Sequence, residues 1–214
     1  MNAAKIEAKI QRGNGKAAKV LGVVCDQYRP VNSGPPIVDT NLLGIVMARF
    51  DQDFQFSARK PNLYAHPVWG VLVDRTLLAV GDYLVGQEGT FFLIARQSLT
   101  PTAGVSCNRV ISISRPTAPT PGPNAYGGVV NNTPIVTSWP ASVLQGTKGE
   151  RGDLNLPGDV RMPWVSILIP AVPGVQIRFG DIVTDDQADA LRYTVSGAEL
   201  TDLGYRITAA QTTA

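Results

Sequence analysis

The sequence has 214 residues, of which 17% are charged and 44% apolar, with two cysteines and one histidine. This length and balance suit one large or two small folded domains and exclude a largely disordered chain. No run of 18 apolar residues is present and the N-terminus lacks an apolar signal core, so neither a membrane span nor export is expected. A single histidine argues against zinc sites with several Cys and His ligands and against His-based triads.

The first 19 residues form a basic arm with five basic side chains and one acidic one. A helix is predicted over residues 2–11, with Ile6 and Ile10 on one face, and residues 13–15 (Gly-Asn-Gly) are predicted to end it. Because a helix this short is not stable alone, the two isoleucines are expected to dock on the barrel or on a neighbouring subunit. The basic side chains expected to flank this contact are Lys5, Lys9 and Arg12. They suit DNA or an acidic protein surface, and a simple solvated face is the alternative.

Two apolar runs follow the arm, at 20–25 and 42–50, and both are predicted to be strands. The segment between them is rich in Pro, Gly and Asn and is expected to be a loop. Residues 51–67 are polar and interrupted by prolines, which predicts an exposed excursion used for recognition or subunit contact.

A β meander is predicted between Trp69 and Ser114, because four short apolar runs there are separated by turn residues. The last run alternates apolar and polar residues with one slip near Asn108. The runs cover residues 69–73, 81–85, 90–96 and 105–114.

A second copy of this pattern is predicted between residues 164 and 209. In both copies a tryptophan heads an apolar run, a Gly-Asp pair opens the next strand, and an aromatic strand and a closing strand follow. The alternative is that any two β meanders look alike. The residues that define the repeat are Trp69, Gly81, Asp82, Trp164, Gly180 and Asp181.

These patterns predict a mainly β protein, with two small barrels or sandwiches in tandem behind a short N-terminal helix. A proline-rich stretch between the two copies is interpreted as the linker, because prolines are excluded from central strands. The predicted division is an arm at 1–19, a first domain at 20–115, the linker at 116–124 and a second domain at 125–214.

Motifs that would carry chemistry are missing, so no catalysis, cofactor or metal is expected. The sequence has no phosphate-binding loop and no Gly-x-Ser-x-Gly elbow. An acidic cluster near residues 181–189 lacks the closing carboxylate of a calcium loop, which favours a solvated turn. Cys25 and Cys107 are expected to be separate buried thiols, although a bridge between them stays open.

Several residues of the first unit carry a resemblance to a known group of proteins, namely Tyr28-Arg29-Pro30, Trp69-Gly70, Gly81-Asp82-Tyr83-Leu84-Val85, residues 90–95 and Cys107-Asn108-Arg109-Val110. The pattern resembles tailed-bacteriophage virion proteins, and the order of its strands is similar to the small barrels of head–tail joining proteins of the phage neck. Simple stoppers have one such barrel, so the second unit departs from that pattern.

This resemblance implies a structural component of the virion, assembled in the host cytoplasm as a ring of identical subunits at the neck or tail. The implied partners are other neck or tail proteins, with non-specific contact to DNA in the channel, and no membrane. The alternative is a carbohydrate-binding β module at a tail tip, with exposed aromatic residues stacking on sugars. The candidates for that role are Trp69, Trp139, Trp164, Tyr64 and Tyr126.

Overall fold

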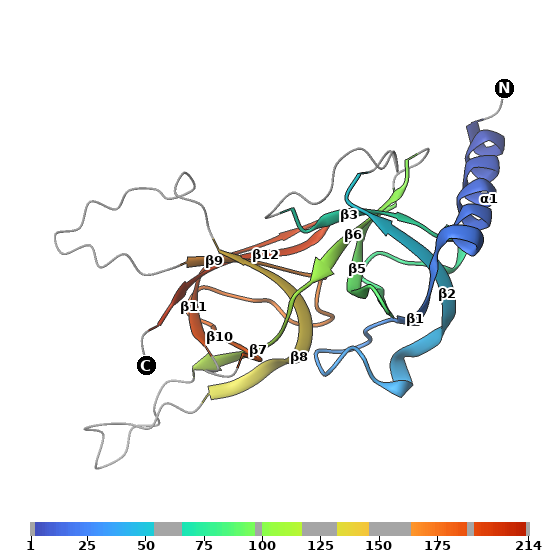
Figure 1. Cartoon of the computed structure of the whole chain (residues 1–214). Helices are drawn as coiled ribbons and strands as arrows, with labels where there is room; N and C mark the ends of the chain where they lie inside the picture. The colour runs from blue at the N-terminus through green and yellow to red at the C-terminus, as the bar shows by residue number, and fades with distance from the viewer. Residues whose placement is uncertain are drawn as a thin grey trace, which may run out of the picture.

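The computed structural model describes residues 3–53, 66–96, 100–116, 132–145, 164–187 and 191–212. These residues form one α-helix and two closed six-stranded antiparallel barrels that lie side by side (Figure 1). The helix, α1 (Ala3–Leu21), stands at the outer end of the first barrel, away from the second. The expected mainly β fold, with two small barrels and an N-terminal helix, is therefore confirmed.

The first barrel closes in the order β1-β2-β3-β6-β5-β4. Alternation along β1 and β2 sends every second side chain inward, and the rings of Phe50 and Phe91 stack in this core with centroids 3.9 Å apart. Two short 3-10 turns, Asp39–Asn41 and Arg75–Leu77, lie in its loops. Its strands are β1 (Val23–Tyr28), β2 (Leu42–Asp51), β3 (Val68–Leu72), β4 (Tyr83–Gly86), β5 (Gly89–Ala95) and β6 (Thr102–Cys107).

The second barrel repeats this topology strand for strand. Read from its first strand, it closes in the order β7-β8-β9-β12-β11-β10, the same path that β1 to β6 follow in the first barrel. The chain is thus a tandem duplication of one barrel topology within a single polypeptide. The strands are β7 (Arg109–Pro116), β8 (Asn132–Gln145), β9 (Trp164–Ile169), β10 (Ile182–Asp185), β11 (Arg192–Thr201) and β12 (Gly204–Gln211).

The change from one barrel to the other comes at Asn108, earlier than the sequence indicated. Strand β7 pairs with β8 and with β10, so residues 109–116 belong to the second barrel. The slip in alternation near Asn108 is where the chain leaves one barrel and enters the next. The first residue of the expected linker at 116–124 is the last residue of β7, so the boundary between the barrels is corrected to Asn108. Residues 117–131 lie outside the described residues.

Helix α1 is longer than predicted, because it continues through Gly13, Asn14 and Gly15 to Leu21. The expected end at residue 13 and the expected strand start at residue 20 are therefore wrong. A glycine inside a helix costs about 1 kcal/mol relative to alanine. Gly15 and Ala18 are buried against the first barrel, and this packing offsets that cost.

Candidate assembly surfaces

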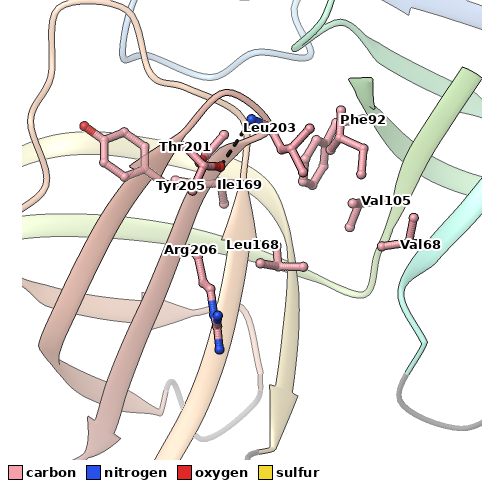
Figure 2. A pocket seen from close by; sticks show the side chains of 11 residues that line it. Val68, Phe92, Val105, Leu168, Ile169, Thr201, Leu203, Tyr205 and Arg206 are labelled. Atoms are coloured by element: carbon pink, nitrogen blue, oxygen red, sulfur yellow. Dashed lines mark hydrogen bonds between the residues drawn. The ribbon is translucent and has the colours of Figure 1, made fainter. Parts of the chain in front are cut away.

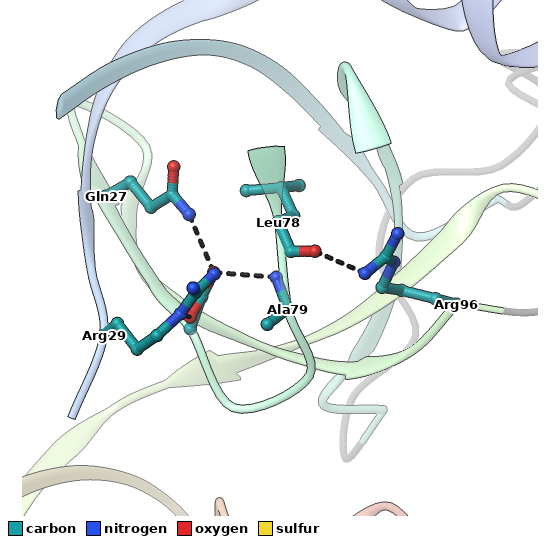
Figure 3. A network of polar contacts seen from close by, with 6 residues as sticks. Gln27, Arg29, Leu78, Ala79 and Arg96 are labelled. Atoms are coloured by element: carbon teal, nitrogen blue, oxygen red, sulfur yellow. Dashed lines mark hydrogen bonds and ion pairs between the residues drawn. The ribbon is translucent and has the colours of Figure 1, made fainter. Parts of the chain in front are cut away.

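A buried carboxylate organises the turn before β4 (Figure 3). Gly81 has φ of 90°, a conformation that favours glycine, and it places Asp82 so that its side chain is completely buried. Arg29 at the end of β1 grips this carboxylate with two hydrogen bonds of 2.7 and 2.8 Å. The Ala79 N–H and the Gln27 amide donate two more, at 2.8 and 2.7 Å. Asp82 thereby ties β1 to the loop that enters β4.

The second barrel contains the same device. Gly180 has φ of 85°, and the buried Asp181 accepts hydrogen bonds of 2.8 and 2.9 Å from Arg115 at the end of β7. The Arg178 N–H donates to the same carboxylate at 2.8 Å. The backbone bonds match as well, because the carbonyls of Asp82 and Asp181 each accept from the facing strand, at 3.0 and 2.9 Å. The two Gly-Asp pairs therefore occupy equivalent turns, and the sequence analysis did not connect Arg29 or Arg115 with them.

The two tryptophans of the predicted repeat do not occupy equivalent positions. Trp69 on β3 pairs with Gly104 on β6. The residue of β12 that corresponds to Gly104 is Ala209, and Ala209 pairs with Val165 on β9. Trp164 is therefore one residue out of register with Trp69, which places it on the other face of its strand. Trp69 packs edge-on against Phe91 at the first core, whereas Trp164 is half-buried at the start of β9.

The barrels are joined by a core that extends from the second barrel into the first around Tyr83 and Trp139, beside a separate core within the first barrel. Both side chains are fully buried, and their rings meet edge to face with centroids 6.1 Å apart. The Tyr83 hydroxyl donates to the Pro140 carbonyl at 2.9 Å, and the Trp139 indole N–H donates to the carbonyl of Gly34 at 2.7 Å. Burial raises the pKa of Tyr83 well above its usual value, so this hydroxyl stays protonated. These contacts join the barrels into a single packed unit.

Helix α1 contacts the first barrel at a position equivalent to the one where the first barrel contacts the second. A methyl group at Gly15 would lie 3.5 Å from Cβ of Asp74, which follows β3 closely. In the same way, a methyl group at Gly81 would lie 3.7 Å from Cβ of Pro170, which follows β9. Hydrogen bonds from Thr76 lower the pKa of Asp74, and the positive charge of Lys19 on α1 lowers it further. The helix thus packs on the first barrel just after β3, the position that corresponds to the one after β9 where the second barrel contacts the first.

The residues of the expected docking helix separate onto two faces of α1. Ile6 and Ile10 are half-buried. At about 100° per residue they lie roughly 100–140° around the helix from the centre of the basic face. That face is exposed and carries Lys5, Lys9 and Arg12. The structure therefore does not bring the isoleucines and the basic residues together in one contact.

An exposed apolar patch, here called the β1–β2 patch, runs from the end of α1 over the outer face of β1 and β2. Ile45 is 68% exposed and Val24 56% exposed, although both lie in regular strands of the barrel. In this part of β1 and β2 the sequence is apolar on both faces, which was the available signal for the patch. The patch consists of Val20, Leu21, Val24, Leu43 and Ile45.

Two hollows lie between the barrels. The first is an apolar cavity of about 200 Å³ beside the β11–β12 turn (Figure 2), lined by residues such as Phe92, Val105, Leu168 and Leu203. The second is an open groove of about 180 Å³ that includes His66 and Trp69 together with polar side chains.

The remaining candidates from the sequence are the cysteines, the acidic cluster and the aromatic residues. Cys25 and Cys107 are both free, and burial raises the pKa of Cys25 to about 11. Asp185 accepts a hydrogen bond from Tyr193 at 3.3 Å, while Asp189 lies outside the described residues. In the described part of the chain, no group of three His, Cys, Asp or Glu side chains is placed to hold a metal ion. Of the aromatic candidates for sugar stacking, Trp139 is fully buried, and Tyr64 and Tyr126 lie outside the described residues.

Comparisons with protein-family models, with curated proteins and with solved structures give no match. Among the described residues, no helix has the length and hydropathy needed to cross a membrane.

Proposed function

We propose that this protein is a structural component of a tailed-bacteriophage particle, which assembles as a ring of identical subunits at the neck or tail. The observation that carries the assembly part of the proposal is the exposed β1–β2 patch. Burying one large aliphatic side chain contributes about 1.5–3 kcal/mol, so five of them on one face favour association before its entropic cost. Exposed apolar clusters of this kind mark contact sites rather than ordinary surface.

The shape of the protein supports assembly through faces. Both barrels are closed, so no strand edge in them is left open for pairing with another subunit. The joined core gives each subunit a fixed geometry, which a closed ring requires because every subunit must repeat the same rotation. The patch lies on the first barrel, and we propose that it contacts a different surface of the next subunit, in a heterologous interface.

The setting in a phage particle comes from the resemblance of the sequence to virion proteins. On this proposal, the N-terminal half of α1, with Ile6 and Ile10, contacts the next subunit or another neck or tail protein. The sequence contains no phosphate-binding loop and no Gly-x-Ser-x-Gly elbow. The protein is therefore proposed to act through binding alone.

The test of the patch is the Val24→Asp/Ile45→Asp variant, examined by light scattering after size exclusion and by negative-stain microscopy. The wild-type protein should form closed rings, and the variant should be monomeric with an unchanged circular dichroism spectrum. Leu200→Asp is the matched control, because Leu200 is 58% exposed on the second barrel, outside the patch. A wild-type protein that stays monomeric at its highest soluble concentration would overturn the ring.

The test of the particle role is made in a host that supplies only the variant chain during phage growth. Mass spectrometry of purified particles should find the wild-type and Leu200→Asp chains and should not find the patch variant. Particle yield should fall with the patch variant, because an unfilled position in the neck leaves particles incomplete. Normal particles that lack the protein altogether would reject the structural role.

A second candidate is carbohydrate binding in the groove beside Trp69. This groove combines an aromatic edge with the polar side chains of Gln52, His66 and Ser106, a combination that suits sugars. The amide of Asn108, which also lines the groove, is already paired with the backbone of Val143 at 2.8 and 2.9 Å. Glycan-array binding that is lost in Trp69→Ala and kept in Trp164→Ala would favour this candidate over the ring.

A further inference from the structure

The basic side chains of α1 form a single straight row. They recur at intervals of four, three, four and three residues, which keeps them on one side of a helix. At about 100° per residue all five fall within an arc of about 80°, and at 1.5 Å per residue the row is about 21 Å long. The row, here called the basic stripe, consists of Lys5, Lys9, Arg12, Lys16 and Lys19.

The stripe faces solvent along its whole length. All five side chains are exposed, while the buried residues Gly15 and Ala18 hold another face of α1 on the barrel. The N-terminal half of the helix stands clear of the barrel body (Figure 1). Among the described residues none of the five makes an ion pair, and only Lys19 lies close enough to Asp74 to lower its pKa. Within the described part of the chain, none of the other four cations therefore forms an ion pair.

We propose that the basic stripe binds the phosphate backbone of double-stranded nucleic acid without regard to sequence. This inference names a partner for the proposed particle component, and it rests on that function only for its biological setting. A duplex presents one negative charge per about 1.7 Å of its axis, and a straight row of cations matches such a linear array. The flanking side chains Ala8 and Gly13 are small and exposed, so the helix can approach the backbone closely.

The composition of the stripe favours a polyanion over an acidic protein surface. Protein interfaces exclude lysine from their centres and place aromatic or aliphatic side chains there. The stripe contains four lysines and one arginine with no large apolar residue among them. Lysine acts as a point charge, which suits phosphates and carries no base specificity.

The experiment is fluorescence anisotropy of a labelled DNA duplex of random sequence, titrated with the full-length protein at several salt concentrations. Four phosphate contacts predict a slope of log K against log salt of about −3.6, which is a loss of about 150-fold between 50 and 200 mM salt. Lys9→Glu/Lys16→Glu should reduce the slope by about 1.8 and weaken binding about 100-fold at low salt. Glutamate is as good a helix former as lysine, so circular dichroism should show the helix retained.

The matched control is Arg192→Glu/Arg206→Glu, which changes the net charge equally at exposed positions on β11 and β12. This control should bind DNA like the wild-type protein. Equal loss in both double variants, or no binding by the wild-type protein at low salt, would overturn the proposal. Tighter binding to poly-glutamate than to the duplex would assign the stripe to an acidic protein instead.

The oligomeric state of the same variants separates this inference from the ring. Lys9→Glu/Lys16→Glu should still form rings while losing DNA, and Val24→Asp/Ile45→Asp should lose rings while single subunits keep the salt-dependent binding. Loss of DNA binding in the patch variant, with the stripe intact, would reject the stripe as the binding element.

Discussion

Replacing Trp139 by phenylalanine tests whether the two barrels unfold as one unit. The indole is completely buried, and its N–H donates to backbone carbonyls of Ser33 and Gly34 in the first barrel at 3.2 and 2.7 Å. Phenylalanine keeps a ring against Tyr83 but leaves the half-buried Gly34 carbonyl without this donor, at a cost of about 1 kcal/mol, while the Ser33 carbonyl still accepts from the Thr137 N–H. The smaller ring also leaves a cavity, so the total loss of unfolding free energy should be about 2–4 kcal/mol.

The assay is urea unfolding followed by two probes in a Cys107→Ala background. Far-UV circular dichroism reports both barrels, whereas labelling of the buried thiol of Cys25 reports the first barrel alone. For a slope of about 2–3 kcal/mol per M, both midpoints should fall together by about 1 M, because Tyr83 and Phe92 share a core with Trp139. Trp164→Phe, at a half-buried site, is the matched control and should shift both urea midpoints much less. A Cys25 midpoint that stays in place while the dichroism becomes biphasic would refute the joined core.

Two further predictions concern buried acids and thiols. Asp82→Asn and Asp181→Asn should each lower the unfolding free energy by about 2–4 kcal/mol, mostly through lost buried acceptors because the partner arginines are partly exposed. Thermal melts should show the larger loss for Asp82→Asn, since Gln27 also donates there, and a loss below about 1 kcal/mol at both sites would contradict the role of the turn. For Cys25, whose pKa is raised from 9.0 to about 11 mainly by burial, the native state keeps a proton that the unfolded state releases. The stability advantage of the wild-type protein over Cys25→Ala should therefore be constant below pH 9 and shrink between pH 9 and 11, and urea midpoints that stay parallel across this range would disprove the assignment.

Local sequence patterns determined much of the secondary structure of this protein. Alternation of apolar and polar residues predicts a strand and the face it buries, because successive side chains point to opposite sides. Glycine before aspartate predicts the turn before β4 and before β10, since few other residues adopt the positive φ found at Gly81 and Gly180. These rules act over a few residues, so the mainly β class, the tandem arrangement and the equivalent turns could be predicted from the sequence.

Contacts between distant residues decided the rest. The alternation near Asn108 does not reveal that β6 and β7 close different barrels, because closure depends on hydrogen bonds to strands far away in the chain. Helix propensity ends α1 at Gly13, whereas the barrel surface that receives Gly15 extends it to Leu21. Apolar residues on both faces of β1 and β2 indicate that one face stays exposed, but only the closed barrel decides that Ile45 lies on the outer face. The basic stripe also depends on a tertiary contact, because its residues form one row only when the helix continues past Gly13 and Gly15.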